Sequence, residues 1–137
     1  GFKKAMAEND LMINKKYIKY GAYTRNGGYQ AAKELLSRAE LPTAVFAAND
    51  QMAIGVINAI QEEGLSVPED ISVIGFDDIE ASRLMSPGLT TIRQPTYEMG
   101  KLAAEKIFSE LKDKENCNEN INLKAKLVIR ESCAELK

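Results

Sequence analysis

Histidine is absent from the sequence, and this absence bears directly on function. Histidine is the commonest general base near neutral pH and the commonest metal ligand, so without it catalysis and metal binding are both less expected. The serines have no histidine to activate them, and no GxSxG segment occurs. Gly27-Gly28 lacks the pattern of a phosphate-binding loop, and Asp77-Asp78 has no second acidic cluster at a metal-binding spacing. We therefore expect a protein that is not an enzyme and that carries no metal and no cofactor.

Cysteine is scarce, and a large surplus of one charge and long apolar runs are missing. Cys117 and Cys133 are too few for a disulfide framework and do not form a CxxC pair, which favours reduced thiols in the cytoplasm. The net charge is −2 with acids and bases interspersed, so the basic stripe of a nucleic-acid-binding domain is absent. The apolar runs are too short to cross a membrane, and the first residues lack the pattern of a secretory signal. We expect a cytoplasmic protein in which this segment contacts neither membrane nor DNA.

Apolar residues make up 45% of the 137 residues, which is enough for one hydrophobic core. Their spacing predicts strands that alternate with helices. The expected helices cover residues 2–9, 29–38, 49–63, 77–85 and 95–111. The expected strands cover residues 17–23, 43–48, 71–76, 89–93 and 124–130, with a polar loop over 112–120. This alternation predicts an α/β fold with a doubly wound parallel sheet.

Polar and aromatic residues follow four of the expected strands. They are Tyr23, Asn49-Asp50, Asp77-Asp78 and Gln94. Ligands of open parallel sheets bind beyond the carboxyl ends of the strands, and carboxylates and amides suit neighbouring hydroxyl groups. An aromatic ring can cover the C–H face of a sugar. Helix N-capping is the alternative for each acid and amide, and Tyr23 alone is more typical of a surface aromatic. The agreement of four strand ends favours a polyol ligand.

Three segments resemble the lactose/galactose-repressor (LacI/GalR) family. Residues 48–55, ANDQMAIG, resemble its ANDxMAxG segment. Residues 67–78, VPEDISVIGFDD, resemble its VPxDISVxGFDD segment, and residues 87–95, PGLTTIRQP, resemble PxLTTIxQP. The blocks occur in the family's order, and the similarity covers nearly the whole chain. The first block is shared with periplasmic sugar-binding proteins, whereas the other two are more specific to the repressors.

The resemblance implies a particular place for the chain in a larger protein. Residues 1–137 would form the C-terminal part of an effector-binding core with two periplasmic-binding-protein-like, flavodoxin-like subdomains. Residues 1–93 and 121–137 would belong to the C-terminal subdomain, and residues 94–120 would be a crossover helix and loop of the N-terminal subdomain. The helix-turn-helix headpiece, most of the first subdomain and an effector-gripping arginine lie upstream in the family and are absent from this segment.

The resemblance also implies a function. Tyr23 falls where the family places an aromatic against the effector, Asn49 and Asp77 fall on polar effector contacts, and Gln94 lies at the hinge. The expected function is the effector-sensing and dimerisation part of a DNA-binding transcriptional regulator, a repressor of carbohydrate-utilisation genes. Its partners would be a small sugar or sugar-phosphate effector, a second copy of the chain, and operator DNA through the headpiece alone. The alternative is a sugar-binding protein of a transport system.

The same resemblance implies a two-fold dimer interface. The positions that match it are Ile54, Asn58, Leu84 and Met85. The alternative is that Ile54 and Leu84 are ordinary core residues. Gly55, beside Ile54, would allow a helix to approach closely, and Leu84-Met85 precede a turn. A self-complementary patch is expected for a symmetric dimer.

One strand of a flavodoxin-like subdomain is not found in the segment. The usual strand order places a first strand between the expected strands at 17–23 and 43–48, and none precedes residues 2–9. The helix at 95–111 would also lack the subdomain that it covers, which would expose Met99, Leu102 and Ile107. We therefore expect that residues 1–137 alone are not a self-sufficient effector-binding unit.

Overall fold

Strands and helices alternate along the chain, as the spacing of its apolar residues predicts. The computed structural model describes residues 1–113 and 120–135. The helices are α1 (Phe2–Glu8), the short 3-10 helix η1 (Lys15–Tyr17), α2 (Arg25–Leu36), α3 (Asp50–Glu62), α4 (Glu80–Leu84) and α5 (Thr96–Asp113). The strands are β1 (Ala44–Phe46), β2 (Ser72–Ile74), β3 (Thr91–Arg93) and β4 (Lys126–Val128). Part of the loop expected over 112–120 lies outside the described residues. None of the described helices combines the length and hydropathy that a membrane span requires.

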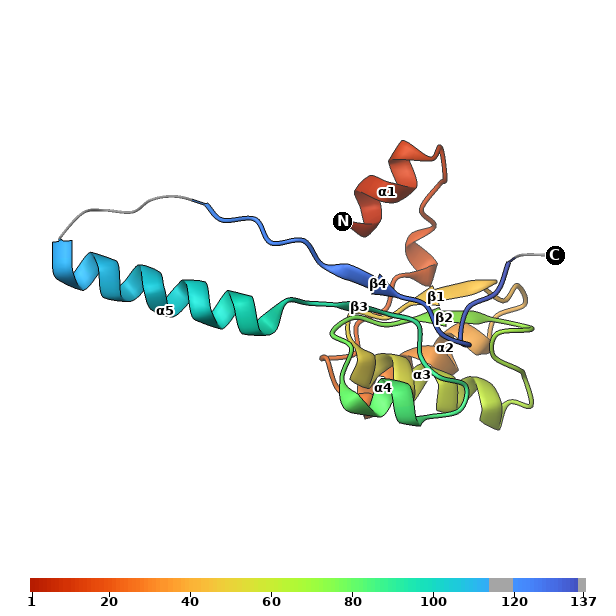
Figure 1. Cartoon of the computed structure of the whole chain (residues 1–137). Coiled ribbons are helices and arrows are strands. Elements are labelled where there is room, and N and C mark those ends of the chain that lie inside the picture. The colour runs from red at the N-terminus through yellow and green to blue at the C-terminus, as the bar shows by residue number, and fades with distance from the viewer. Residues whose placement is uncertain (114–119, 136–137) are drawn as a thin grey trace.

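The strands lie side by side in the order of the chain. β1 pairs in parallel with β2, with Val45 opposite Val73. A parallel bridge from Ile74 to Thr90 joins β2 to the segment that enters β3, and β3 pairs antiparallel with β4. In Figure 1, α1 lies on one side of the strands, and α3 and α4 lie on the other. The predicted α/β fold with helices on both faces of a parallel sheet is therefore confirmed.

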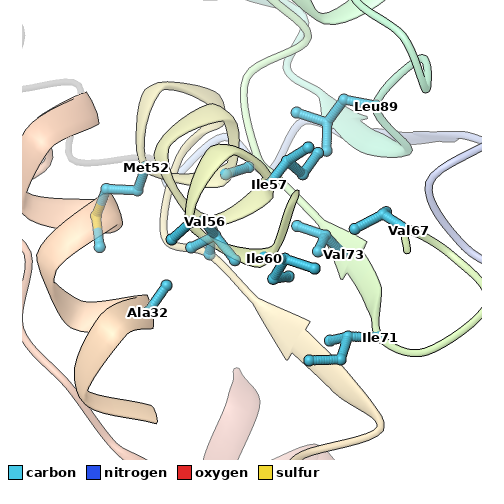
Figure 2. Close-up of a cluster of buried hydrophobic side chains, with 12 residues drawn as sticks. Ala32, Met52, Val56, Ile57, Ile60, Val67, Ile71, Val73 and Leu89 are labelled. Atoms are coloured by element: carbon cyan, nitrogen blue, oxygen red, sulfur yellow. The ribbon is translucent and has the colours of Figure 1, made fainter. Parts of the chain in front are cut away.

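The core lies between α3 and the strands. Ile57 and Ile60 of α3 point toward Val73 and Ile71 of the β2 region, and Leu89 closes the cluster near β3 (Figure 2). Each of these five side chains is almost fully buried. Burial of an aliphatic side chain of this size contributes about 1.5–3 kcal/mol, so the cluster fixes α3 against the strands.

α2 and α3 pack closely because a glycine of each faces the other helix. A Cβ atom on Gly28 would overlap the backbone of Met52, and one on Gly55 would overlap the carbonyl oxygen of Arg25. The close approach that Gly55 allows is therefore used inside the chain, against α2. The argument that Gly55 serves a partner's helix is wrong.

The ends of the helices follow from local side chains. Thr24 accepts a hydrogen bond from the backbone N–H of Gly27 at 3.0 Å and so caps α2. Because of this cap, α2 begins at Arg25, four residues before the predicted start. At the end of α3, Gly64 adopts a positive φ of 75°, and the N–H of Leu65 donates to the carbonyl of Ile60. This is the glycine C-cap that the sequence predicts.

The strand predicted over residues 17–23 does not form. Lys15–Tyr17 is a 3-10 helix, residues 18–20 have no ladder partner in the described chain, and Ala22 and Tyr23 have positive φ values. Among the described residues, β2 pairs with one edge of β1, and the other edge of β1 has no strand beside it. Residues 18–20 therefore have no adjacent strand with which to form a ladder. An apolar, β-prone sequence becomes a strand only where a ladder partner accepts its hydrogen bonds.

α5 projects away from the rest of the molecule (Figure 1). Met99 and Ile107 are exposed on it, as predicted, while Leu102 is partly buried. A shallow groove of about 270 Å³ lies between α5 and the segment that leads to β4, with Met99, Leu102 and Ile121 in its wall. α5 therefore has little contact with the body of the described chain.

Candidate ligand-binding site

The segments that follow β1, β2 and β3 meet at one edge of the sheet. The backbone N–H of Asp50 donates to the carbonyl of Phe76 at 2.8 Å, and that of Asp77 donates to the carbonyl of Ile92 at 2.9 Å. These hydrogen bonds keep the three chain segments side by side beyond the residues that form the β-ladders. The three loops that carry the predicted site residues are therefore held side by side.

Asn49 and Tyr23 form one pair at this edge. The Nδ2 of Asn49 donates to the carbonyl oxygen of Tyr23 at 3.1 Å, while its Oδ1 accepts from the backbone N–H of Met52 at 2.9 Å. Asn49 is thus the N-cap of α3, as the capping alternative predicts. The cap also orients the amide, and the Tyr23 side chain, 71% exposed, remains open to a ligand.

Asp77 and Gln94 form the second pair. The Nε2 of Gln94 donates to the Oδ1 of Asp77 at 2.6 Å, and both residues are half-buried. Asp77 does not cap α4, whose N-cap residue is Ile79. The Oδ2 atom of Asp77 takes part in none of the hydrogen bonds among the described residues. The pair therefore presents one carboxylate oxygen and one amide oxygen that can accept hydrogen bonds from hydroxyl groups.

Asp78 joins the loop of Asp77 to the two ends of the antiparallel β3–β4 pair. It accepts hydrogen bonds from the Nη2 of Arg130 at 2.6 Å and from the Nε of Arg93 at 2.5 Å. Burial alone would raise the pKa of Asp78, but the hydrogen bonds and positive charges of the two arginines outweigh it and lower the pKa. The sequence predicts Asp78 only as a candidate helix cap or ligand-binding residue. Its two arginine partners lie 15 and 52 residues away, so the local sequence does not predict these ion pairs.

Asp50 is fully buried behind this edge and has no surface open to a ligand. Its Oδ2 accepts from the backbone N–H of Ile79 at 2.9 Å and from the hydroxyl of Ser82 at 2.6 Å. Its Oδ1 accepts from the hydroxyl of Thr91 at 2.5 Å. Asp50 therefore supports the start of α4 and β3, a role that sequence reasoning missed when it considered only the residue's own helix.

The four predicted dimer residues lie on α3 and at the C-terminal end of α4, and they differ in exposure. Leu84, at the end of α4, is 73% exposed, and Met85 is half-buried against the core. Asn58 is half-buried on α3, and Ile54 is only 7% exposed. Leu84 is therefore the member that presents the most apolar surface to a partner.

Nearly the whole chain matches a known domain family. The sequence pattern of the periplasmic binding protein-like domain matches residues 1–133, and this match agrees with the strand and helix order described above. The repressor PurR of Histophilus somni is 46% identical over 136 residues, which are 99% of this chain and 41% of that protein. The ribose operon repressor of Haemophilus influenzae is 39% identical over 137 residues, which are 100% of this chain and 41% of that protein.

Solved structures agree in fold. A LacI transcriptional regulator from Bacillus cereus subsp. cytotoxis superposes with a TM-score of 0.95 at 30% identity, over 100% of this chain and 49% of that chain. A LacI-family regulator from Enterococcus faecium with bound ribose gives 0.88 at 35% identity, over 99% and 50%. A lac repressor dimer bound to operator gives 0.89 at 34% identity, over 98% and 46%. The chain belongs to the periplasmic binding protein-like domain family, and the relatives and solved structures that it resembles are repressors and regulators, several of them of the LacI family. It spans 41% of the length of the two curated relatives named above.

Proposed function

We propose that the chain is the effector-binding and dimerisation part of a LacI-family repressor that responds to a small sugar. The observation that carries the proposal is the pairing of the four predicted site residues at one edge of the sheet. Asn49 is bonded to the backbone of Tyr23, and Gln94 is bonded to Asp77. The relatives named above are repressors and regulators, which favours this function over the transport alternative and over an enzyme.

The chemistry of these residues suits a sugar. The free oxygen of Asp77 accepts a hydrogen bond from a hydroxyl group, and the carbonyl oxygen of Gln94 accepts another. A charged acceptor gives the stronger of the two bonds. The exposed ring of Tyr23 offers an apolar face to the C–H side of a sugar ring. The ribose bound to the Enterococcus faecium regulator supports this ligand class.

The larger protein would couple this site to DNA. We assign residues 1–93 and 121–137 to one subdomain and residues 94–120 to a crossover that contributes to a second subdomain, with the effector between them. Two copies would pair through Leu84, Met85, Asn58 and Ile54; the dimeric state of the lac repressor supports pairing of two copies. Operator DNA would contact only a separate headpiece, in the cytoplasm. The effector would then shift the equilibrium between two states by its different affinity for each.

Calorimetry on the full-length protein tests this function. We expect one of D-ribose, cellobiose and sucrose to bind, because these sugars are bound in the structures of three similar transcriptional regulators. We expect Asp77→Ala to weaken that binding by roughly 5- to 150-fold, which corresponds to about 1–3 kcal/mol. Glu69→Ala is the control, because Glu69 is exposed and lies in the turn before β2. Binding of none of the three sugars, or equal affinity of Asp77→Ala and the parent, would contradict the proposal.

A further inference from the structure

The carboxylate of Asp50 is enclosed by three segments of the chain. It is fully buried at the first residue of α3. The backbone N–H of Ile79 and the hydroxyl of Ser82 bring it two donors from the start and middle of α4. The hydroxyl of Thr91 brings a third donor from β3. One side chain thus connects α3, α4 and β3.

Each of these three segments also carries a residue to which the proposed function assigns a role, within three residues of Asp50 or of its hydrogen-bond donor. Asn49 precedes Asp50 directly, Ser82 lies two residues before Leu84, and Thr91 lies three residues before Gln94. The ligand edge and the proposed dimer helix therefore share one buried acceptor. The residues that bind and the residues that pair have no direct hydrogen bond to each other among the described residues.

The geometry around Asp50 leaves little room for adjustment. A Cβ atom on Gly75 would overlap its Oδ1, so the strand backbone passes close against the carboxylate. A buried charge keeps its donors because an unpaired one is strongly destabilising. The N-terminus of α3 adds favourable partial charges to the same site. A shift of any one donor segment therefore requires the others to follow.

We propose that Asp50 is a positioning residue that couples the strand leading to Gln94 with helix α4. In this arrangement, a displacement of β3 at the ligand edge changes the position and stability of α4, and the reverse holds as well. The biological meaning of the coupling rests on the proposed function, since it would link effector binding to the dimer interface.

The test compares two adjacent buried threonines. Thr91 donates to Asp50, whereas the hydroxyl of Thr90 bonds to the backbone of Arg130 instead. Hydrogen exchange of the full-length protein is followed in the peptide that covers residues 79–85. We expect Thr91→Val to speed exchange there on the order of tenfold, as the loss of one hydrogen bond to a charged group implies. Thr90→Val is expected to leave it unchanged, and Thr91→Ser, which keeps the hydroxyl, is expected to behave like the parent.

Equal exchange of residues 79–85 in Thr91→Val and Thr90→Val would overturn the coupling. If Thr91→Val does not fold, Ser82→Ala tests the reverse direction, because the amide of Asp77 bonds to the carbonyl of Ile92 on β3. Faster exchange at Asp77 supports the proposal, and unchanged exchange overturns it. The measurement needs neither sugar nor dimer, so a failure of the proposed function would be seen separately, in the calorimetry of the parent.

Discussion

Removal of the charge of Asp78 should destabilise the protein, because Arg130 would lose its carboxylate partner. The side chains of Asp78 and Arg130 are 6% and 16% exposed, whereas that of Arg93 is 57% exposed. Loss of one partner from a buried ion pair costs about 3–5 kcal/mol, and an exposed pair contributes about 0–1 kcal/mol. Arg130 keeps its hydrogen bond to the carbonyl of Leu89. We therefore expect Asp78→Asn to lower the free energy of unfolding by about 2–4 kcal/mol at neutral pH.

The size of this effect should depend on pH. The pKa of Asp78 is lowered in the folded protein, so the folded state binds fewer protons at this group than the unfolded state does. The stabilisation is fully present above the ordinary aspartate pKa of about 3.9 and is lost as the pH falls through the lowered folded pKa. The difference between parent and variant should therefore shrink as the pH falls from about 7 toward about 3.

Urea unfolding of the full-length protein, followed by circular dichroism, measures the difference at both pH values. Glu80→Gln is the matched control, because Glu80 pairs with Arg83 on an exposed face of α4. The control should change the free energy of unfolding by no more than about 0.5 kcal/mol. An Asp78→Asn effect as small as that of the control, or one that does not change with pH, would refute the reasoning.

Three further predictions follow from the packing and the proposed interfaces. Gly55→Ala should lower the free energy of unfolding by about 1–3 kcal/mol in thermal or urea unfolding, because its Cβ would overlap the carbonyl of Arg25; a neutral result would contradict the close α2–α3 contact. Leu84→Asp should raise the dimer dissociation constant at least about tenfold in sedimentation without unfolding the chain, since most of its side chain is exposed; an unchanged constant would remove it from the interface. Residues 1–137 alone should bind the sugar at least about tenfold more weakly than the full-length protein in calorimetry, because effector contacts in the larger protein would be missing; equal affinity would contradict this.

Elements with strong local signals were predictable from the sequence. α3 has apolar residues at helical spacing between Asn49, a capping residue, and Gly64, a C-cap glycine, and its bounds differ by one residue from those expected. β2 arises from a short apolar run between a turn and an acidic pair. The alignment of the strand ends followed from the parallel topology, which places successive loops at one edge.

Features that depend on distant partners were not predictable. Residues 17–23 have a strand-like composition, but strand formation requires a neighbouring ladder, and the described chain provides none at the free edge of β1. Asp50 and Asp78 could be recognised as candidate caps, but not as acceptors for Thr91 and Arg130, which follow them by 41 and 52 residues. Sequence spacing carries no information about such pairs until the topology is known.

The central claim is that a sugar binds at the edge where β1, β2 and β3 end. A crystal structure of the full-length protein, grown with whichever of D-ribose, cellobiose and sucrose binds in calorimetry, tests it most directly. We predict sugar hydroxyl groups within about 2.5–3.2 Å of Asp77, next to the Asn49 cap and under the ring of Tyr23. A sugar bound elsewhere, with no hydroxyl group in reach of Asp77, would contradict the account.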